Sequence, residues 1–329
     1  MQSLGRIARH CGAALAMTLT LAGIAAAQGA KPWHHAIIEA KSDAGIFMMV
    51  TKGFAAKQGV TLEIVQFKSD VIALQALLAG DVESFDGGPG AALVAAARGA
   101  DVKVIGCEWP GVPYAVFVGR DIAAPQDLKG KVFAISSPGA NPDVVARAVL
   151  AKFGIPASDV QLANLGSDLD RFKAVVAGVA QATVVSNEYT PIAEAQGIKL
   201  LVRASDVIPD FMRVCIFSTA KVLAARGDDA AHFLAAEMTA LRYALGHRDE
   251  TLALTREVTN GKPDDPRPAF IYGDAVKTHS IDPEMNIPID KLRWMEEQAL
   301  RDKILPQPYD VTKLIDENVR RKALQLAGN

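Results

Sequence analysis

Small polar residues follow an apolar run in the segment DLKGKVFAISSPGANPDVVARAVLAKFGI, residues 127–155. Ser136 and Ser137 carry hydroxyl groups, Gly139 is expected to expose its backbone N–H, and Asn141 precedes a helical pattern. A helix N-terminus favours negative charge through its dipole and its free N–H groups. Because the GxGxxG and GxxxxGK[ST] patterns of nucleotide loops are missing, the segment predicts a site for a different small anion. Simple turn formation is the alternative for both serines.

Other predicted strands end in residues suited to the same ligand. In an open α/β sheet, ligands bind beyond the carboxyl ends of the strands. Glycines there let a backbone approach a ligand closely, aromatic rings can wall an organic body, and an arginine can pair with a carboxylate or sulfonate. Core packing for the aromatic rings and a surface position for the arginine are the alternatives. The candidates are Ser42, Asp43, Phe67, Gly87, Gly88, Pro89, Trp109, Tyr114, Asn187, Tyr189 and Arg213.

The sequence offers no strong enzymatic motif. His34 and His35 are neighbours in a predicted strand, so their side chains point to opposite faces, and no further ligands follow at metal spacing. Neither a G-x-S-x-G elbow nor a C-x-x-C pair is present. We therefore expect a protein that is not an enzyme and has no cofactor, no metal and no catalytic residue.

Residues 1–27 have the pattern of a secretory signal peptide. Arg6 and Arg9 precede the uncharged apolar run Cys11–Ala26, and Ala25 and Ala27 form an A-x-A site before Gln28. A buried N-terminal helix is the alternative. The pattern predicts cleavage near Ala27 and a periplasmic location.

Charge argues against nucleic acid as a partner. The chain has 329 residues and a net charge of −2. Loss of Arg6 and Arg9 leaves two fewer basic residues than the original 35, against 37 acidic ones, so the mature net charge is near −4. A basic binding surface is therefore not expected.

Cys107 and Cys215 remain after removal of the predicted signal peptide. An exported protein can form a disulfide between them. Two small buried hydrophobic residues are the interpretation that we favour, because sequence alone does not give the Cα separation that a disulfide needs.

A unit of alternating strands and helices occurs twice in the chain. Three glycine pairs mark it: Gly59 and Gly154, 95 residues apart, and Gly80 with Gly178 and Gly99 with Gly197, both 98 apart. Glycine just past a helix is typical of a left-handed C-terminal residue. Alternating strands and helices imply mostly parallel sheets. The repeat therefore predicts two similar α/β lobes; chance similarity of Ala-rich helices is the alternative.

The element pattern divides the chain into four parts. Seven β-rich runs predict strands: HAIIEA, TLEIVQF, VKVIGC, YAVFVG, VFAIS, TVVS and VCIFST. Predicted helices include 142–153, capped by Asn141, one capped by Ser167, and 230–246, 292–300 and 311–326. We expect a signal peptide at 1–27, lobe 1 at 28–114, lobe 2 at 115–216, and a return to lobe 1 with C-terminal helices at 217–329.

Several of these segments resemble a known group of transport proteins. AAKQGVTLEIV, ALLAGDVESFDGGPGAALVAAARGADVKVIG, the opening segment 127–155 and VVSNEYTPIAEAQG are similar to nitrate/sulfonate/taurine-type substrate-binding proteins of ABC importers, a group that includes pyrimidine-precursor-binding proteins. The resemblance covers residues 36–218. Gln181 stands where the group often has Asp, and Thr190 separates Tyr189 from Pro191.

The resemblance implies a two-lobed type II periplasmic-binding-protein fold with two crossover strands and a cleft that closes on ligand. It places the ligand contacts in the loops 41–45, 87–89 and 136–141. It also implies a monomer that delivers a small organic anion to an ABC permease in the inner membrane. Alkyl sulfonate, taurine, nitrate, aromatic acid and pyrimidine are all open as ligands. An enzyme on the same fold, resembling a desulfinase or a pyrimidine-precursor synthase, and a binding protein that feeds a sensor are the alternatives.

Overall fold

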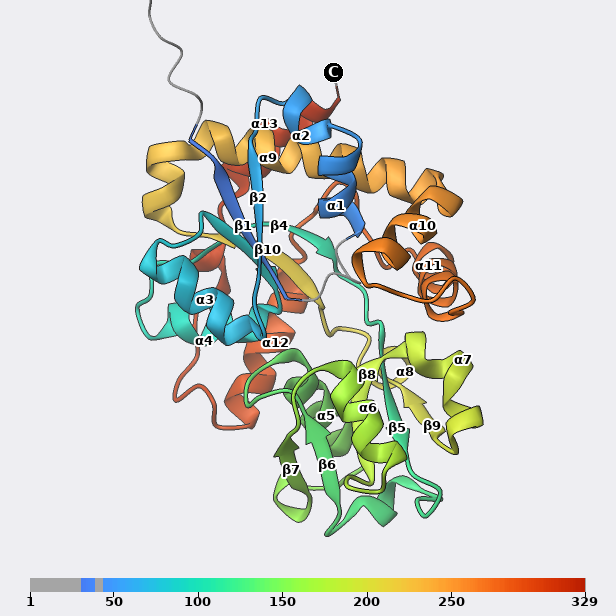
Figure 1. Ribbon diagram of the computed structural model, residues 1–329. Helices are drawn as coiled ribbons and strands as arrows, with labels where there is room; N and C mark the ends of the chain where they lie inside the picture. The colour runs from blue at the N-terminus through green and yellow to red at the C-terminus, as the bar shows by residue number, and fades with distance from the viewer. Residues whose placement is uncertain (1–30, 39–43, 329) are drawn as a thin grey trace, which may run out of the picture. The chain divides into compact units, whose positions relative to one another are not determined.

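The computed structural model describes residues 31–38 and 44–328 (Figure 1). The predicted signal peptide and the candidate residues Ser42 and Asp43 lie outside the described residues. Within the described part of the chain, no helix has both the length and the apolar character needed to cross a bilayer.

The first sheet has five strands in the order β2-β1-β3-β10-β4. Their bounds are Leu62–Gln66 for β2, Trp33–Ile37 for β1, Ser84–Gly87 for β3, Val214–Ser218 for β10 and Lys103–Trp109 for β4. β1 pairs in parallel with β2 and β3, whereas β10 runs antiparallel to both β3 and β4. Four strands therefore run in one direction, and β10 alone opposes them.

The second sheet repeats this plan in the order β7-β6-β8-β5-β9. The bounds are Gln161–Asn164 for β7, Val132–Ile135 for β6, Ala182–Ser186 for β8, Tyr114–Val118 for β5 and Lys199–Arg203 for β9. β5 is antiparallel to β8 and β9, so it fills the position that β10 fills in the first sheet. We call each sheet with its helices a lobe. The predicted α/β fold with two mostly parallel sheets and two crossover strands is confirmed.

Helices cover both sheets. In lobe 1 they are α1 (Ala44–Thr51), α2 (Phe54–Lys57), α3 (Asp70–Ala79) and α4 (Pro89–Ala97). In lobe 2 they are α5 (Asn141–Lys152), α6 (Asp168–Val176), α7 (Thr190–Ala193) and α8 (Ala204–Val207). The C-terminal part adds α9 (Ala220–Gly246), α10 (Arg248–Val258), α11 (Arg267–Thr278), α12 (Ile289–Arg301) and α13 (Glu317–Ala327). α9 packs on α1 and α13, while α12 contacts α4 of lobe 1 and α5 of lobe 2 (Figure 1).

The predicted internal repeat is present in the backbone. Gly80 follows α3 with φ 86°, and Gly178, 98 residues later, follows α6 with φ 73°. The other four glycines of the three pairs also have positive φ. Because these angles suit glycine better than any other residue, the shared spacing reflects a shared structure.

Side-chain hydrogen bonds repeat at the same spacing. Asp70 Oδ1 accepts the backbone N–H of Gly88 at 2.8 Å, and Asp168 Oδ2 accepts that of Ser186 at 3.0 Å. Each carboxylate opens a helix, α3 or α6, and ties it to the residue at the end of the neighbouring strand or just after it. The two lobes therefore fix the loops at the carboxyl ends of their strands by one mechanism.

A second repeated hydrogen bond lies at the opposite ends of the strands in each sheet. Glu83 Oε2 accepts the N–H of His34 at 2.8 Å, and Gln181 Oε1 accepts that of Val132 at 3.1 Å. Both bonds lie at the N-terminal ends of the strands, away from the loops that follow them. Gln181, which departs from the family pattern, therefore has a structural partner in lobe 2.

Helix starts differ in part from the predictions. Ser167 caps α6 by accepting the N–H of Asp170, as predicted. Asn141 is the first residue of α5 instead of its cap, and Ala140 occupies the cap position without a side-chain bond. The Asn141 amide instead donates to the carbonyl of Arg213 at 2.8 Å, because this tertiary partner replaces the local one. Near the C-terminus, a bridge from Val104 to Ile315 divides the predicted helix 311–326.

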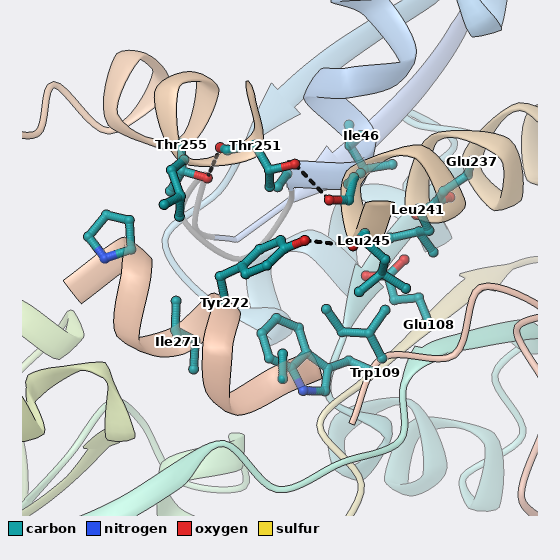
Figure 2. Close-up of a pocket in the computed structure, with 17 residues that line it drawn as sticks. Ile46, Glu108, Trp109, Glu237, Leu241, Leu245, Thr251, Thr255, Ile271 and Tyr272 are labelled. Carbon is teal, nitrogen blue, oxygen red and sulfur yellow. Dashed lines mark hydrogen bonds between the residues drawn. The ribbon is translucent and has the colours of Figure 1, made fainter. Parts of the chain in front are cut away.

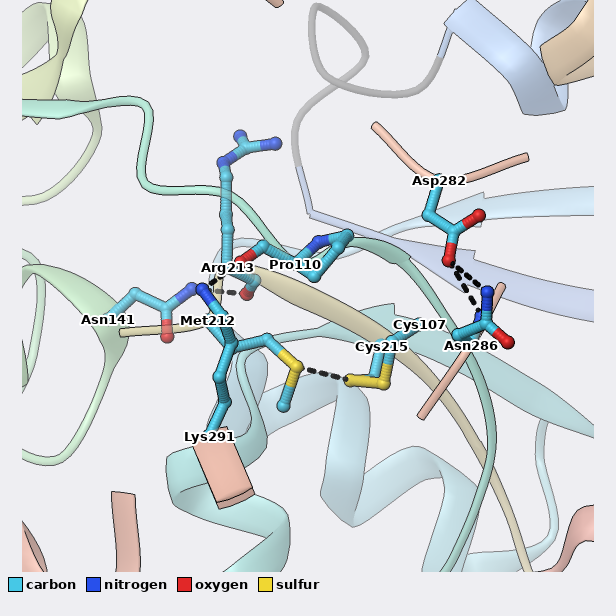
Figure 3. Close-up of a disulfide and its surroundings, with 9 residues drawn as sticks. All are labelled: Cys107, Pro110, Asn141, Met212, Arg213, Cys215, Asp282, Asn286 and Lys291. Carbon is cyan, nitrogen blue, oxygen red and sulfur yellow. Dashed lines mark hydrogen bonds between the residues drawn. A yellow bond between two sulfur atoms is a disulfide. The ribbon is translucent and has the colours of Figure 1, made fainter. Parts of the chain in front are cut away.

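Cys107 and Cys215 form a disulfide between β4 and β10 (Figure 3). The favoured interpretation of two separate buried thiols is therefore wrong. The strands are antiparallel neighbours with an irregular register between Val214 and Ile216, which brings the two cysteines together. The 108-residue separation in sequence hides this proximity.

We expect the double substitution C107S/C215S to lower the free energy of unfolding by about 2–5 kcal/mol, because the bridge restricts a long loop of the unfolded chain. Urea unfolding with and without reductant measures this loss. Reductant should destabilise the wild type and leave the variant unchanged. Equal stability of the two oxidised proteins would contradict the expectation.

His35 is fully buried in lobe 1. Its Nδ1 lies 2.8 Å from Ser84 Oγ, and its ring packs against Phe233 of α9 with centroids 4.9 Å apart. Burial lowers the pKa of this imidazole to about 3. The folded protein therefore keeps His35 neutral at pH values where the unfolded chain binds a proton.

Stability should consequently fall as the pH drops from 6.5 toward 3, by about 1.4 kcal/mol per pH unit from this residue. H35Q should remove this contribution and flatten the profile. Urea unfolding at several pH values measures it, and H34Q, which retains His35, is the matched control. An H35Q profile as steep as that of the wild type would refute the assignment.

Candidate functional site

A cavity of about 440 Å³ lies between loops of the two lobes. It is bounded by the ends of β2 and β3, the starts of α5 and α6, and the connections that join the sheets. Seven candidate residues line it: Phe67, Gly87, Gly88, Tyr114, Ser136, Asn141 and Arg213. These residues come from five separate stretches of the chain, which follow the strands or connect the two sheets.

The other described candidates lie elsewhere. Pro89 is buried at the start of α4, and Ser137 and Gly139 belong to the loop before α5 without lining the cavity. Tyr189 lines a separate groove of about 850 Å³ beside the segment 258–268, while Asn187 donates to Asp274 of α11. Trp109 lines a third cavity inside lobe 1.

The loop before α5 supplies its own anion. Gly139 donates its N–H to Asp143 Oδ2 at 2.8 Å, and Ala140 donates to the carbonyl of Ser137 at 3.2 Å. Asp143 in turn pairs with Arg147 at 2.8 Å. The prediction of an exposed N–H at Gly139 is therefore wrong, since a carboxylate one turn into the helix occupies the dipole end.

Arg213 supplies a buried positive charge beside the cavity. Its residue is 6% exposed, so the alternative of a surface arginine is wrong. The guanidinium lies over the Trp109 ring at 4.4 Å and at 5.9 Å from the Tyr114 ring. Its backbone N–H donates to the Trp109 carbonyl at 3.2 Å, and its carbonyl accepts from Asn141 (Figure 3). Such a fixed, desolvated guanidinium is suited to a carboxylate or sulfonate.

Two aspartates of the cavity were absent from the sequence candidates. Asp70 and Asp168 line it while they hold the N–H groups of the facing loops. The signal was available, because KSDV and GSDL place Ser-Asp at the same 98-residue spacing as the glycines. Both carboxylates thus hold loops, and the backbone of these loops forms part of the cavity wall.

The lobes touch at one side of the cavity. A Cβ atom on Gly88 of lobe 1 would lie 2.0 Å from Asn141 Oδ1 of lobe 2, and one on Gly90 would lie 3.3 Å from the Gly139 carbonyl. Glycine at position 88 is therefore required for this approach of the two lobes.

Gly88→Ala should destabilise the protein by about 1–3 kcal/mol through overpacking against Asn141. Asn141→Ala makes room for the added methyl group, so the double variant should lose less than the sum of the single losses. Thermal and urea unfolding of the four proteins give this coupling. Gly273→Ala, in an open and exposed part of α11, is the control and should be neutral or slightly stabilising. Strict additivity would contradict the contact.

Residues 41–251 match the family model described as NMT1/THI5 like, so the chain belongs to that family. The match covers the lobe 1 strands from β2 onward, all of lobe 2, all of α9 and the start of α10. No curated protein sequence matches the chain.

Several solved structures with the same fold are named as sulfonate- or nitrate-binding proteins. The periplasmic aliphatic sulphonate binding protein SsuA from Escherichia coli matches 87% of this chain and 92% of its own, with 18% identity and a TM-score of 0.71. The alkanesulfonate-binding protein SsuA from Xanthomonas axonopodis pv. citri, bound to MOPS, matches 87% and 98% at 18% identity and a TM-score of 0.71. The periplasmic nitrate-binding protein NrtA from Synechocystis PCC 6803 matches 89% and 88% at 16% identity and a TM-score of 0.69. The two-lobed periplasmic-binding-protein fold inferred from the sequence is thereby confirmed.

Proposed function

We propose that this protein is the periplasmic solute-binding component of an ABC importer and captures a small organic anion between its lobes. The observation that carries the proposal is the buried Arg213 guanidinium, stacked on Trp109 and next to Tyr114 at the edge of the interlobe cavity. Family membership and the sulphonate- and nitrate-binding neighbours support the same class of ligand.

In this proposal different cavity residues contact different parts of the ligand. Arg213 pairs with the carboxylate or sulfonate, and the Ser136 hydroxyl donates to one of its oxygens. Gly87 and Gly88 let the lobe 1 backbone approach the ligand, while Phe67 and Tyr114 contact its organic part. Asn141 couples the start of lobe 2 to the Arg213 backbone, so ligand contacts at either lobe act on one shared segment.

The proposal also covers location and processing. A signal peptide at 1–27 directs the protein to the periplasm and is cleaved near Ala27. The mature protein is a monomer whose lobe boundaries lie near residues 114 and 216. Hinge closure on the ligand then produces the form that the permease recognises. The protein binds its cargo without chemical change and needs no cofactor.

A thermal-shift screen of the chain from Gln28 tests the proposal. A ligand that binds only the folded state raises the melting temperature. At a ligand concentration of 100 Kd, the free energy of unfolding increases by about 2.7 kcal/mol. The panel consists of methanesulfonate, taurine, longer alkyl sulfonates, nitrate, aromatic acids and pyrimidines. We expect a rise with one organic anion, and chromatography should recover that compound unchanged.

Replacement of the guanidinium identifies the site. R213Q should weaken binding of the hit by about 10- to 100-fold, since a charge-assisted bond contributes about 1.5–3 kcal/mol. R293Q is the matched control, because it removes an exposed arginine of α12 that pairs with Asp290. This variant should bind the compound as the wild type does. Turnover of the compound, or full affinity in R213Q, would refute the proposal.

A further inference from the structure

A second cavity, which we call the recess, lies inside lobe 1 beneath the C-terminal helices (Figure 2). Its volume is about 70 Å³, and residues of α1, α9, α10, α11 and the end of β4 line it. A single water needs about 10–15 Å³, so the recess has room for a fragment of about five non-hydrogen atoms. Most of the lining is aliphatic, with Leu241, Leu245, Leu252 and Ile271 among it.

Three of the six polar side chains that line the recess donate to backbone carbonyls. The Tyr272 hydroxyl donates to the Leu245 carbonyl at 2.6 Å, and the Thr251 hydroxyl donates to the Ala244 carbonyl at 2.8 Å (Figure 2). Thr255 likewise donates to a carbonyl of its own helix. None of these three groups calls for a ligand.

Glu108 is different. It is 6% exposed at the end of β4, and among the residues that the structure describes its Oε2 atom has no hydrogen-bond partner. Burial raises the pKa of its carboxyl group, while the hydrogen bond with Glu237 of α9 and the charge of Arg213 act in the opposite direction. Because a buried acceptor without a donor costs about 1–3 kcal/mol, this oxygen favours a ligand that brings a hydrogen.

Trp109 connects the recess to the proposed anion site. Its ring lines the recess and also supports the Arg213 guanidinium at 4.4 Å. The recess further shares Thr255, Pro268 and Ile271 with the groove beside segment 258–268. The recess and the interlobe cavity have no lining residue in common. The charge of Arg213 nevertheless acts on Glu108, so the stacked Arg213 and Trp109 side chains connect the two sites.

We propose that the recess is a subsite for an apolar part of the ligand that ends in an N–H donor, with Glu108 Oε2 as the acceptor. Combined with the anion site at Arg213, on whose assignment this reading rests, it makes the cargo an organic acid that also carries an amine or ring N–H. Simple alkyl sulfonates and nitrate use only the Arg213 end.

Matched small probes separate the two sites. n-Butylamine has an apolar chain with an N–H donor, butanoate has a similar chain with an acceptor only, and methanesulfonate is confined to the Arg213 end. Saturation-transfer NMR on the chain from Gln28 should detect n-butylamine and not butanoate in the recess. L245F, which fills the recess, should abolish the amine signal, and E108Q, which retains its volume, should weaken amine binding at least tenfold.

The outcomes distinguish the two proposals. Binding of methanesulfonate with no amine binding, in a cooperatively folded protein, overturns the recess assignment and leaves the proposed function intact. Amine binding that both variants weaken, without any organic anion bound, supports the recess and overturns the anion site. Equal binding of n-butylamine and butanoate, or amine binding that neither variant changes, also overturns the assignment of Glu108.

Discussion

The return of the chain through β10 is the constraint on which the rest of the structure depends. β10 separates β3 from β4 and pairs with both, and the disulfide fixes it to β4. Directly before it, the Arg213 backbone bonds to Trp109 and Asn141. Main-chain pairing therefore fixes the backbone of Arg213, and the Trp109 and Tyr114 rings hold its guanidinium. A cation positioned in this way loses little conformational freedom when it meets an anion.

The two lobes apply one design to different sequences. Asp70 and Asp168 hold loops at the ligand side of their sheets, and Glu83 and Gln181 hold strands at the far side. Where the charge differs, as between Glu83 and Gln181, the accepted N–H is equivalent. The two lobes thus share a backbone arrangement with different side chains. In the proposed function, recognition of the ligand rests mainly on residues that do not repeat, such as Arg213.

Local patterns in the sequence predicted more of the fold than of the site. Seven β-rich runs correspond to strands, and the glycine spacing revealed the repeated lobe, because both signals depend on neighbouring residues. The expectation that ligands bind beyond the carboxyl ends of strands gathered Ser136 and Gly88 around one cavity, and Arg213, which directly precedes a predicted strand, lines it too. The partners of individual residues were not predicted. Asp143 accepts the hydrogen bond of the Gly139 N–H, and the two cysteines meet across a long loop. The cysteine pairing depends on a tertiary distance that no short window of sequence contains. Asp143, in contrast, lies only four residues after Gly139, so a local pattern could have predicted that bond.

The strand exchange between the lobes also sets an order in time. All five strands of the second sheet lie between Tyr114 and Arg203, so that sheet is complete as soon as this stretch of chain is available. The first sheet has its β4 edge detached until residues 214–218 arrive. As the chain emerges from its N-terminus, the lobe that begins first is therefore finished last. Until then its β3 edge is open to wrong partners, and during this interval the unfinished sheet is prone to aggregation.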